Sequence, residues 1–177
     1  YGVICRDPTI TDLELFAHAG YDVVWMDLEH GAISTTEAGR LCRAIEHLGM
    51  VPMARIIELT RAQVQSLLDS GFRIILLPGV IDAPQAERLV ELAKYPPIGR
   101  RGVSTCSAST GFRLGDDPLR TLAETNQATH LMVQFEDDTG YRNREAILDV
   151  SGIDMVTVGP MDWSVSLGLM GDEANQV

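Results

Sequence analysis

Three ionisable side chains lie close together directly after an apolar run of the sequence. Asp27, Glu29 and His30 follow the stretch "YDVVWM", and Gly31 comes next. A histidine titrates near neutral pH and serves as a general base, and neighbouring carboxylates can support it. The stretch therefore indicates an acid–base site, with a hydrogen-bonded loop histidine at position 30 as the structural alternative.

A cation stands at the end of the next apolar run along the chain. Arg55 ends "VPMAR", which has the composition of a buried strand. A buried guanidinium needs an anionic partner. The carboxylate of a substrate would serve. Asp27 or Glu29 would also serve, and the pair would then be purely structural.

Two further carboxylates end later apolar runs. Gln134 and Glu136 end the run "HLMVQFE", and Asp162 follows "VTVGP". Carboxylate oxygens suit Mg²⁺ or Mn²⁺, and a protein shell with few ligands leaves coordination positions for water and substrate. Glu136 and Asp162 are therefore candidate ligands of one divalent cation, although each could also be a helix cap or a solvated loop residue.

These residues need elements that bring them together, and the chain alternates short apolar runs with amphipathic helical patterns. We expect strands at 2–5, 21–29, 51–57, 72–80, 129–137 and 153–160, and helices at 8–20, 34–49, 60–71, 82–95, 118–128 and 143–152. Ser34 with Glu37 and Thr60 with Gln63 have capping-box spacing. A glycine- and serine-rich stretch from 96 to about 118 is expected to be irregular. One short helix is expected after residue 160, with no clear element beyond it.

Six successive β–α steps predict a parallel sheet covered by helices. An open doubly wound sheet and a closed (β/α)8 TIM-type barrel both satisfy this order. No G-x-G-x-x-G or P-loop follows the first strand, and polar residues end strand after strand, which favours the barrel. We expect residues 1–177 to form one incomplete barrel domain of about six β–α units. A full barrel needs about 250 residues, so we expect strands seven and eight to lie outside these 177 residues.

The composition excludes several classes of protein. The 177 residues are 45% hydrophobic and carry a formal net charge of −11, which disfavours nucleic acid and anionic membranes as partners. No apolar run approaches the roughly 20 residues of a membrane span, and no signal-peptide pattern is present. Three cysteines without metal-like spacing fit a reducing compartment, with Cys42 as a small buried hydrophobe. We expect a soluble cytoplasmic protein.

Several segments, in the same order, resemble the HpcH/HpaI aldolase and citrate lyase family from about Pro8 to Gly168. They are "AGYDVVWMDLEHG", "VPMARI", "LLDSG", "RIILLPGV", "KYPPIGRRGV", "MVQFED" and "GIDMVTVGPMDWSVSLG". The resemblance implies a class II pyruvate aldolase, such as 4-hydroxy-2-oxoheptanedioate aldolase or a 2-dehydro-3-deoxy-sugar-acid aldolase. Such an enzyme cleaves a 4-hydroxy-2-oxo acid to pyruvate and an aldehyde through a metal-stabilised enolate, using Mg²⁺, Mn²⁺ or Co²⁺.

The resemblance also implies the catalytic roles. His30 matches the proton-accepting histidine, and Arg55 matches the arginine that holds the pyruvate carboxylate. Asp69 of "LLDSG" matches an acid that pairs with this histidine across a subunit contact. The family also implies a homo-oligomer, a hexamer or trimer of dimers.

The remaining matched positions bind metal and substrate. Glu136 and Asp162 match the metal ligands, and Gln134, Met161 and Asp162 match substrate-contacting positions. Met161 is larger than the residue usual in the family, so the acceptor aldehyde is the least constrained part of the prediction. Lys94 is the only lysine and has no strand-end placement, which disfavours a Schiff-base mechanism.

Alternative interpretations keep the fold and change the chemistry. They are a related carbon–carbon lyase, namely an oxaloacetate decarboxylase or a CoA-thioester lyase, and a non-catalytic protein that binds 2-oxo acids.

Overall fold

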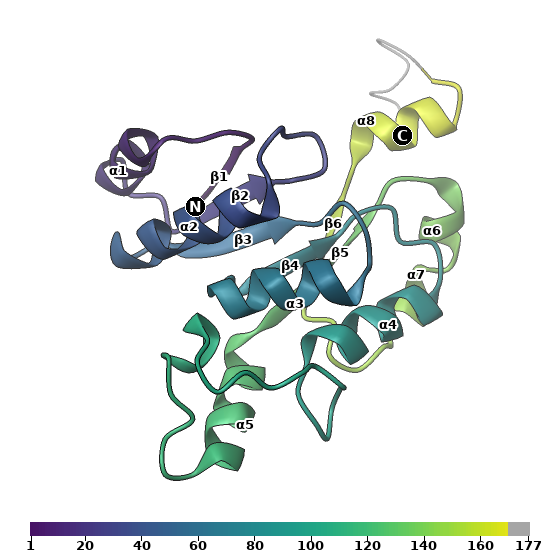
Figure 1. Ribbon diagram of the computed structural model, residues 1–177. Coiled ribbons are helices and arrows are strands. Elements are labelled where there is room, and N and C mark those ends of the chain that lie inside the picture. The colour runs from purple at the N-terminus through teal and green to yellow at the C-terminus, as the bar shows by residue number, and fades with distance from the viewer. Residues whose placement is uncertain (170–177) are drawn as a thin grey trace.

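A single parallel sheet of six strands forms the centre of the computed structural model, which describes residues 1–169 (Figure 1). The strands are β1 (Gly2–Cys5), β2 (Val23–Asp27), β3 (Val51–Arg55), β4 (Ile74–Leu77), β5 (His130–Phe135) and β6 (Met155–Val158). All six predicted strands are present, each within the predicted range.

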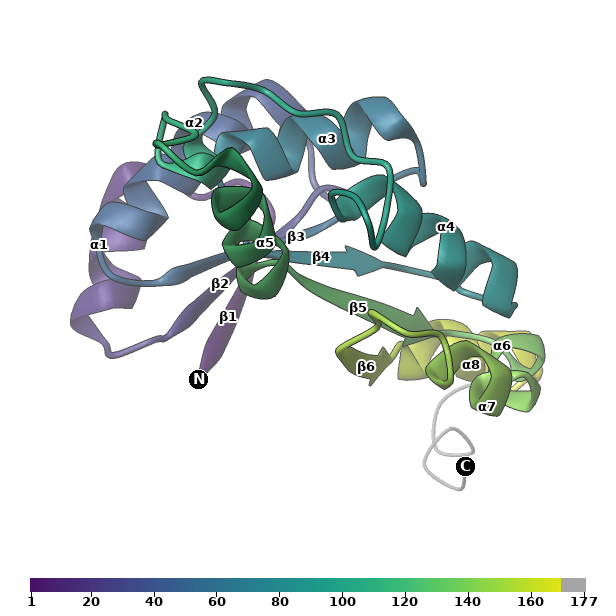
Figure 2. The same cartoon turned by 90° about the horizontal axis from the view of Figure 1, so that it is seen from below.

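The order of the strands decides between the two predicted architectures. Each strand pairs with its neighbour in the sequence, in the order β1-β2-β3-β4-β5-β6, and every pair is parallel. A doubly wound sheet reverses direction along its order, and this sheet does not. Figure 2 shows the strands curling into an arc, with helices along its outer side. The described residues thus form a curled half-barrel, and closure with eight strands stays a prediction.

Helices follow the strands, and the first four of them cover the convex face of the sheet (Figure 2). The helices are α1 (Ile10–His18), α2 (Thr35–His47), α3 (Arg61–Ser70), α4 (Ala83–Ala93), α5 (Pro118–Ala128), α6 (Asp138–Arg142), α7 (Arg144–Leu148) and α8 (Pro160–Ser166), with the 3₁₀ turn η1 (Ala108–Thr110). The short helix expected after residue 160 is α8. The expectation that no element follows it falls mostly on residues 170–177, outside the described residues. Helix α6 was not predicted.

The helix starts use the predicted capping residues with simpler hydrogen bonding than predicted. Ser34 accepts a hydrogen bond from the backbone N–H of Glu37 at 3.2 Å, and Thr60 accepts one from that of Gln63 at 3.3 Å. The side chain of Gln63 accepts from the N–H groups of residues 57 and 58 instead of returning to Thr60. Only one of the two hydrogen bonds of the predicted Thr60 capping box is therefore formed. The Gln63 side chain binds the loop after β3 in place of the Thr60 backbone.

Because side chains alternate along each strand, the sheet has one face toward the helices and an opposite, concave face. In β2, Val24 and Met26 are fully buried in the main core between the sheet and the helices. Trp25 points to the opposite, concave face, where it packs with a smaller cluster that includes Met53 and Leu76. Because side chains alternate along a strand, Asp27, two residues after Trp25 on β2, also points to the concave face.

The buried positions outside the strands agree with the sequence pattern. Cys42 is fully buried on α2 as predicted, and burial raises the pKa of its thiol to about 12. Within residues 1–169, no helix has the length and apolar composition needed to cross a membrane.

The burial of helix side chains against the sheet predicts which substitutions destabilise the protein. Leu68 on α3 is fully buried, whereas Leu119 on α5 is 80% exposed. We expect Leu68→Ala to lower the free energy of unfolding by about 2–5 kcal/mol, because it removes buried methyl groups and leaves a cavity. Leu119→Ala is the matched control and should change it by about 0.5 kcal/mol or less. Urea denaturation of both variants provides the measurement, and equal losses would contradict the assignment of the core.

Candidate functional site

A buried ion pair between neighbouring strands anchors the site. Asp27 and Arg55 are the last residues of β2 and β3, and they lie opposite each other in the register. Nε of Arg55 donates to Oδ1 of Asp27 at 2.9 Å, and Nη2 donates to Oδ2 at 2.6 Å. The Asp27 side chain is 1% exposed and that of Arg55 is 11% exposed. The structural ion pair that the sequence left open is therefore formed.

The pKa of Asp27 reflects opposing influences. Burial alone would raise the pKa of this carboxyl, but hydrogen bonds from Arg55 and from the backbone N–H of His30 outweigh it, and the pKa is lowered. The same pairing outweighs the effect of burial on Arg55 and raises the pKa of its guanidinium. Both groups therefore stay charged, and the bidentate geometry holds the guanidinium plane in place.

Glu29 and His30 follow β2 and extend the network toward the opening. Oε2 of Glu29 lies 3.2 Å from Nε of Arg55 and 3.8 Å from Nε2 of His30. The His30 side chain is about half exposed, whereas Oε2 of Glu29 is buried and accepts no hydrogen bond from any of residues 1–169. The predicted cluster is therefore confirmed in space, with a solvent-accessible imidazole beside a partly buried carboxylate.

The second pair of carboxylates follows β5 and β6, at the other side of the arc. The amide of Gln134 donates to Oε1 of Glu136 just after β5, and Asp162 lies in the first turn of α8. A Cβ atom on Gly159 would lie 2.8 Å from Cγ of Glu136, so glycine is required there for this side chain to fit. Burial, then repulsion by Glu29 and Asp162, raise the pKa of Glu136 above its usual value.

These groups surround one cavity of about 510 Å³ at the carboxyl ends of the strands. Its lining consists of Ile4, Arg6, Trp25, His30, Arg55, Gln134, Val158, Gly159, Pro160, Met161 and Asp162. Five of the predicted site residues line it directly, namely His30, Arg55, Gln134, Met161 and Asp162. Glu136 is not among the lining residues, but it lies directly against two of them, Gln134 and Gly159.

Arg6 and Trp25 are among the lining residues that were not predicted from the sequence. Arg6 directly follows β1, and Trp25 shares the concave parity of Asp27 on β2. The ring of Trp25 lies 5.8 Å from the guanidinium carbon of Arg55, within the range of a cation–π contact. The rule that polar residues at strand ends form the site would have found Arg6, had it also been applied to the first strand.

Asp69 lies apart from this cavity. It is on α3, where Oδ1 accepts a hydrogen bond at 2.6 Å from Nη2 of Arg101. The Arg101 side chain is fully buried, and that of Asp69 is 25% exposed. Within one chain Asp69 is therefore part of the outer helical layer, and its predicted approach to a histidine across a subunit contact stays a prediction.

The single lysine also lies away from the cavity. Lys94 follows α4, and its Nζ donates to the backbone carbonyls of Asn126 and Thr129. Thr129 directly precedes β5, so this lysine is at the amino ends of the strands, opposite the cavity. Burial lowers the pKa of its ammonium group. Its contacts are those of a structural residue.

The donor set fits a divalent cation held by few protein ligands. Among the described residues, no three histidine, cysteine or carboxylate side chains are grouped as in a fully protein-bound metal centre. Repulsion by Asp162 is nevertheless one of the smaller contributions to the raised pKa of Glu136, after burial and repulsion by Glu29. A cation between them would remove this repulsion and leave positions open for other ligands.

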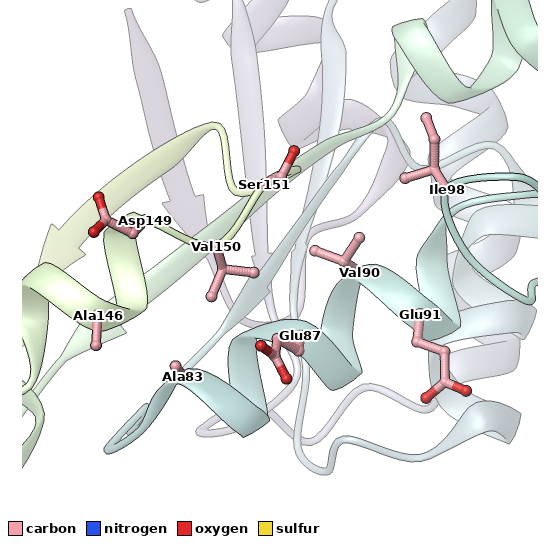
Figure 3. A pocket seen from close by; sticks show the side chains of 9 residues that line it. All are labelled: Ala83, Glu87, Val90, Glu91, Ile98, Ala146, Asp149, Val150 and Ser151. Carbon is pink, nitrogen blue, oxygen red and sulfur yellow. The ribbon is translucent and has the colours of Figure 1, made fainter.

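A second hollow of about 490 Å³ lies on the outer surface between α4 and the segment around α7 (Figure 3). Apolar side chains such as Val90 and Val150 line it beside Glu87 and Asp149. Its lining contains no histidine or arginine among the described residues, and it lies on the helical layer. It is therefore not a candidate catalytic site.

The fold and the site define a protein with a parallel α/β half-barrel and a charged cavity at the carboxyl ends of its strands. The family model described as HpcH/HpaI aldolase/citrate lyase matches residues 8–176. The chain belongs to this family, which confirms the resemblance inferred from its motifs.

Individual relatives agree with this assignment. The 2-keto-3-deoxy-L-rhamnonate aldolase of Salmonella gallinarum is 36% identical over 157 residues, which cover 88% of this chain and 57% of the relative. The crystal structure of an HpcH/HpaI aldolase from Desulfitobacterium hafniense DCB-2 matches with a TM-score of 0.91 and 33% identity, covering 97% of this chain and 66% of that one. The citrate synthase SbnG matches with a TM-score of 0.87 and 29% identity, covering 99% and 69%. The chain thus spans little more than half the length of the curated relative.

The raised pKa of Glu136 generates a pH-dependent prediction. Such a shift favours folding below the unfolded pKa, and this contribution is lost as pH rises through the folded pKa. Without added cations, we therefore expect Glu136→Gln to match the wild type at about pH 4 and to be more stable at about pH 8. Urea midpoints at both pH values measure this. Glu145→Gln, at a side chain that is 87% exposed, is the control.

Adding Mn²⁺ at pH 8 extends the same experiment to the cation. Binding to the folded state should raise the urea midpoint of the wild type and raise that of Glu136→Gln less. This account of the site would be contradicted if the urea midpoints of the two proteins differed by the same amount at both pH values. It would also be contradicted if Mn²⁺ raised both midpoints equally.

Proposed function

We propose that this protein is a metal-dependent class II aldolase that cleaves 4-hydroxy-2-oxo acids to pyruvate and an aldehyde. The observation that carries the proposal is the convergence of His30, Arg55 and Asp162 on one cavity, with Glu136 directly against its lining. The membership of the family and the aldolase name of the Salmonella relative support the same reaction.

The proposed metal ligands are Glu136 and Asp162. A divalent cation bound there, Mg²⁺, Mn²⁺ or Co²⁺, supplies Lewis acidity that stabilises negative charge on the 2-oxo oxygen. Gln134 donates to Glu136 and thereby orients its carboxylate.

Arg55 is the proposed binding group for the substrate carboxylate. Its Nε and Nη2 are engaged by Asp27, whereas its Nη1 makes no hydrogen bond to any of the residues 1–169. Since Asp27 fixes the guanidinium plane, the remaining N–H groups are held ready for an anion. Gln134 and Met161 are the other proposed substrate contacts, because both line the cavity.

His30 is the proposed general base. It takes the proton of the C4 hydroxyl, and the C3–C4 bond then breaks, with C4 leaving as the aldehyde carbonyl. The electron pair of the broken bond forms the enolate of pyruvate, which becomes pyruvate when C3 takes up a proton. The 3.8 Å approach of Glu29 to Nε2 of His30 supports this role, because a carboxylate stabilises the imidazolium that forms.

The reaction is tested by pyruvate release from 4-hydroxy-2-oxo acids, including 2-keto-3-deoxy-L-rhamnonate, with Mg²⁺, Mn²⁺ or Co²⁺. We expect EDTA to abolish release, and His30→Gln to lower kcat by about 10²- to 10⁴-fold. His47→Gln, on an exposed position of α2, is the matched control. Release that continues after chelation would refute the mechanism. Oxaloacetate and acyl-CoA esters, assayed in parallel, detect the alternative lyase activities.

We further propose that the protein acts as a homo-oligomer in which Asp69 supports His30 of a neighbouring subunit. Asp69 lies on the outer helical layer and is a quarter exposed, so it can face another subunit. A hexamer or trimer of dimers is the proposed assembly.

Subunit mixing tests this arrangement. We expect Asp69→Asn and His30→Gln each to lower the rate. Co-expression of the two variants should restore activity above either parent, because some sites then combine an intact His30 with an intact Asp69 of the other chain. Mixed oligomers no more active than the average of the parents would overturn the cross-subunit role.

A further inference from the structure

The cavity contains a second guanidinium, that of Arg6, which directly follows β1. Its Nε lies 3.5 Å from Oδ2 of Asp27. The same oxygen accepts a hydrogen bond from Nη2 of Arg55 at 2.6 Å, so the two nitrogen atoms are at most 6.1 Å apart, the two distances laid end to end. Two cations therefore share one buried carboxylate.

The charge of Asp27 is already neutralised by Arg55. Arg55 binds it in bidentate geometry, whereas the 3.5 Å approach of Arg6 includes no hydrogen bond. The Arg6 guanidinium donates no hydrogen bond to any residue that the structure describes, and its one recorded ion pair is this approach to Asp27. A cation that lines a cavity without neutralising a partner is suited to an anionic ligand.

The two arginines lie at different depths. The Arg55 side chain is 11% exposed and interacts with Glu136, whereas the Arg6 side chain is 66% exposed. Ile4 and Met161, both largely exposed, line the cavity as well. Under the proposed function, the 2-oxo acid end of the substrate lies beside Arg55. The part that becomes the aldehyde then extends toward Arg6.

We propose that Arg6 binds an anionic group, a carboxylate or a phosphate, on the aldehyde-derived part of the substrate. The protein then prefers 4-hydroxy-2-oxo acids with a second negative charge over neutral ones. The orientation of the substrate in this inference rests on the proposed function. The preference for a second negative charge rests on Arg6 alone.

The first test measures binding and does not need turnover. In calorimetry with the full-length protein and Mn²⁺, 2-oxoglutarate is compared with 2-oxopentanoate, which has a methyl group in place of the terminal carboxylate. We expect the wild type to bind 2-oxoglutarate more tightly. Arg6→Gln should reduce this preference by about 10- to 100-fold, the effect of losing one charge-assisted hydrogen bond. Arg6→Lys should retain part of it. Arg120→Gln, at an exposed position of α5, should retain all of it.

The second test measures condensation with pyruvate. Succinic semialdehyde is compared with its methyl ester, and glyceraldehyde 3-phosphate with glyceraldehyde. The ratio of kcat/KM for the charged over the neutral member should fall about 10- to 100-fold in Arg6→Gln. The pair in which it falls identifies the anion as carboxylate or phosphate.

The outcomes separate the two proposals. If Arg6→Gln leaves the calorimetric preference and both kcat/KM ratios unchanged, the role of Arg6 is overturned. The role is also overturned if binding of both 2-oxo acids falls equally, since Arg6 would then hold their common carboxylate. If no aldehyde condenses but Arg6→Gln removes the calorimetric preference, the aldolase proposal fails and the anion subsite stands.

Discussion

The bidentate pair of Asp27 and Arg55 is the interaction on which the site depends. It joins the carboxyl ends of β2 and β3, where Asp27 and Arg55 are register partners. Removal of one partner from such a buried pair leaves an uncompensated charge and typically costs about 3–5 kcal/mol. Asp27 also accepts a hydrogen bond from the backbone N–H of His30, which fixes where the chain turns away from the strand. The position of the candidate base therefore depends on the same carboxylate that orients the candidate carboxylate-binding arginine.

The curvature of the sheet gives this pair its surroundings. A flat sheet would place the ends of β2 and β6 far apart, whereas the arc in Figure 2 turns them toward a common interior. The influence of Glu29 on the pKa of Glu136 shows that groups from β2 and β5 are close enough to interact. The concave face is apolar at its base, where Met53 and Leu76 pack, and charged at the strand ends. The apolar base excludes water beneath the charged layer and strengthens the interactions within it.

The charges of the cavity are divided between two sides. The guanidinium groups of Arg6 and Arg55 lie with Asp27 at the carboxyl ends of β1 to β3. Glu136 follows β5, and Asp162 lies on α8. An unpaired group of carboxylates favours a cation, and an incompletely paired guanidinium favours an anion. A molecule with a chelating polar head and a second negative group would complement both sides. This division is the physical basis for regarding the cavity as a site for a charged substrate.

Local sequence determined much of this protein. The apolar runs predicted the six strands, because a strand buried on both faces consists almost entirely of apolar residues. Ser34, Thr60 and Asp82 indicated where helices begin, because their side chains cap the helix N-termini. The rule that strand ends meet was enough, applied to the sequence alone, to select His30, Arg55, Gln134, Glu136 and Asp162. The sequence did not determine the ion-pair partner of Arg55, because both Asp27 and Glu29 carry a carboxylate. Only the strand register places Asp27 opposite Arg55. Tertiary structure also decided that Arg6 enters the cavity and that Asp69 pairs with Arg101, since these contacts join residues whose proximity depends on how strands and helices pack. The sequence thus specifies elements through short-range periodicity, whereas the pairing of charges is specified only by the register and curvature of the folded sheet.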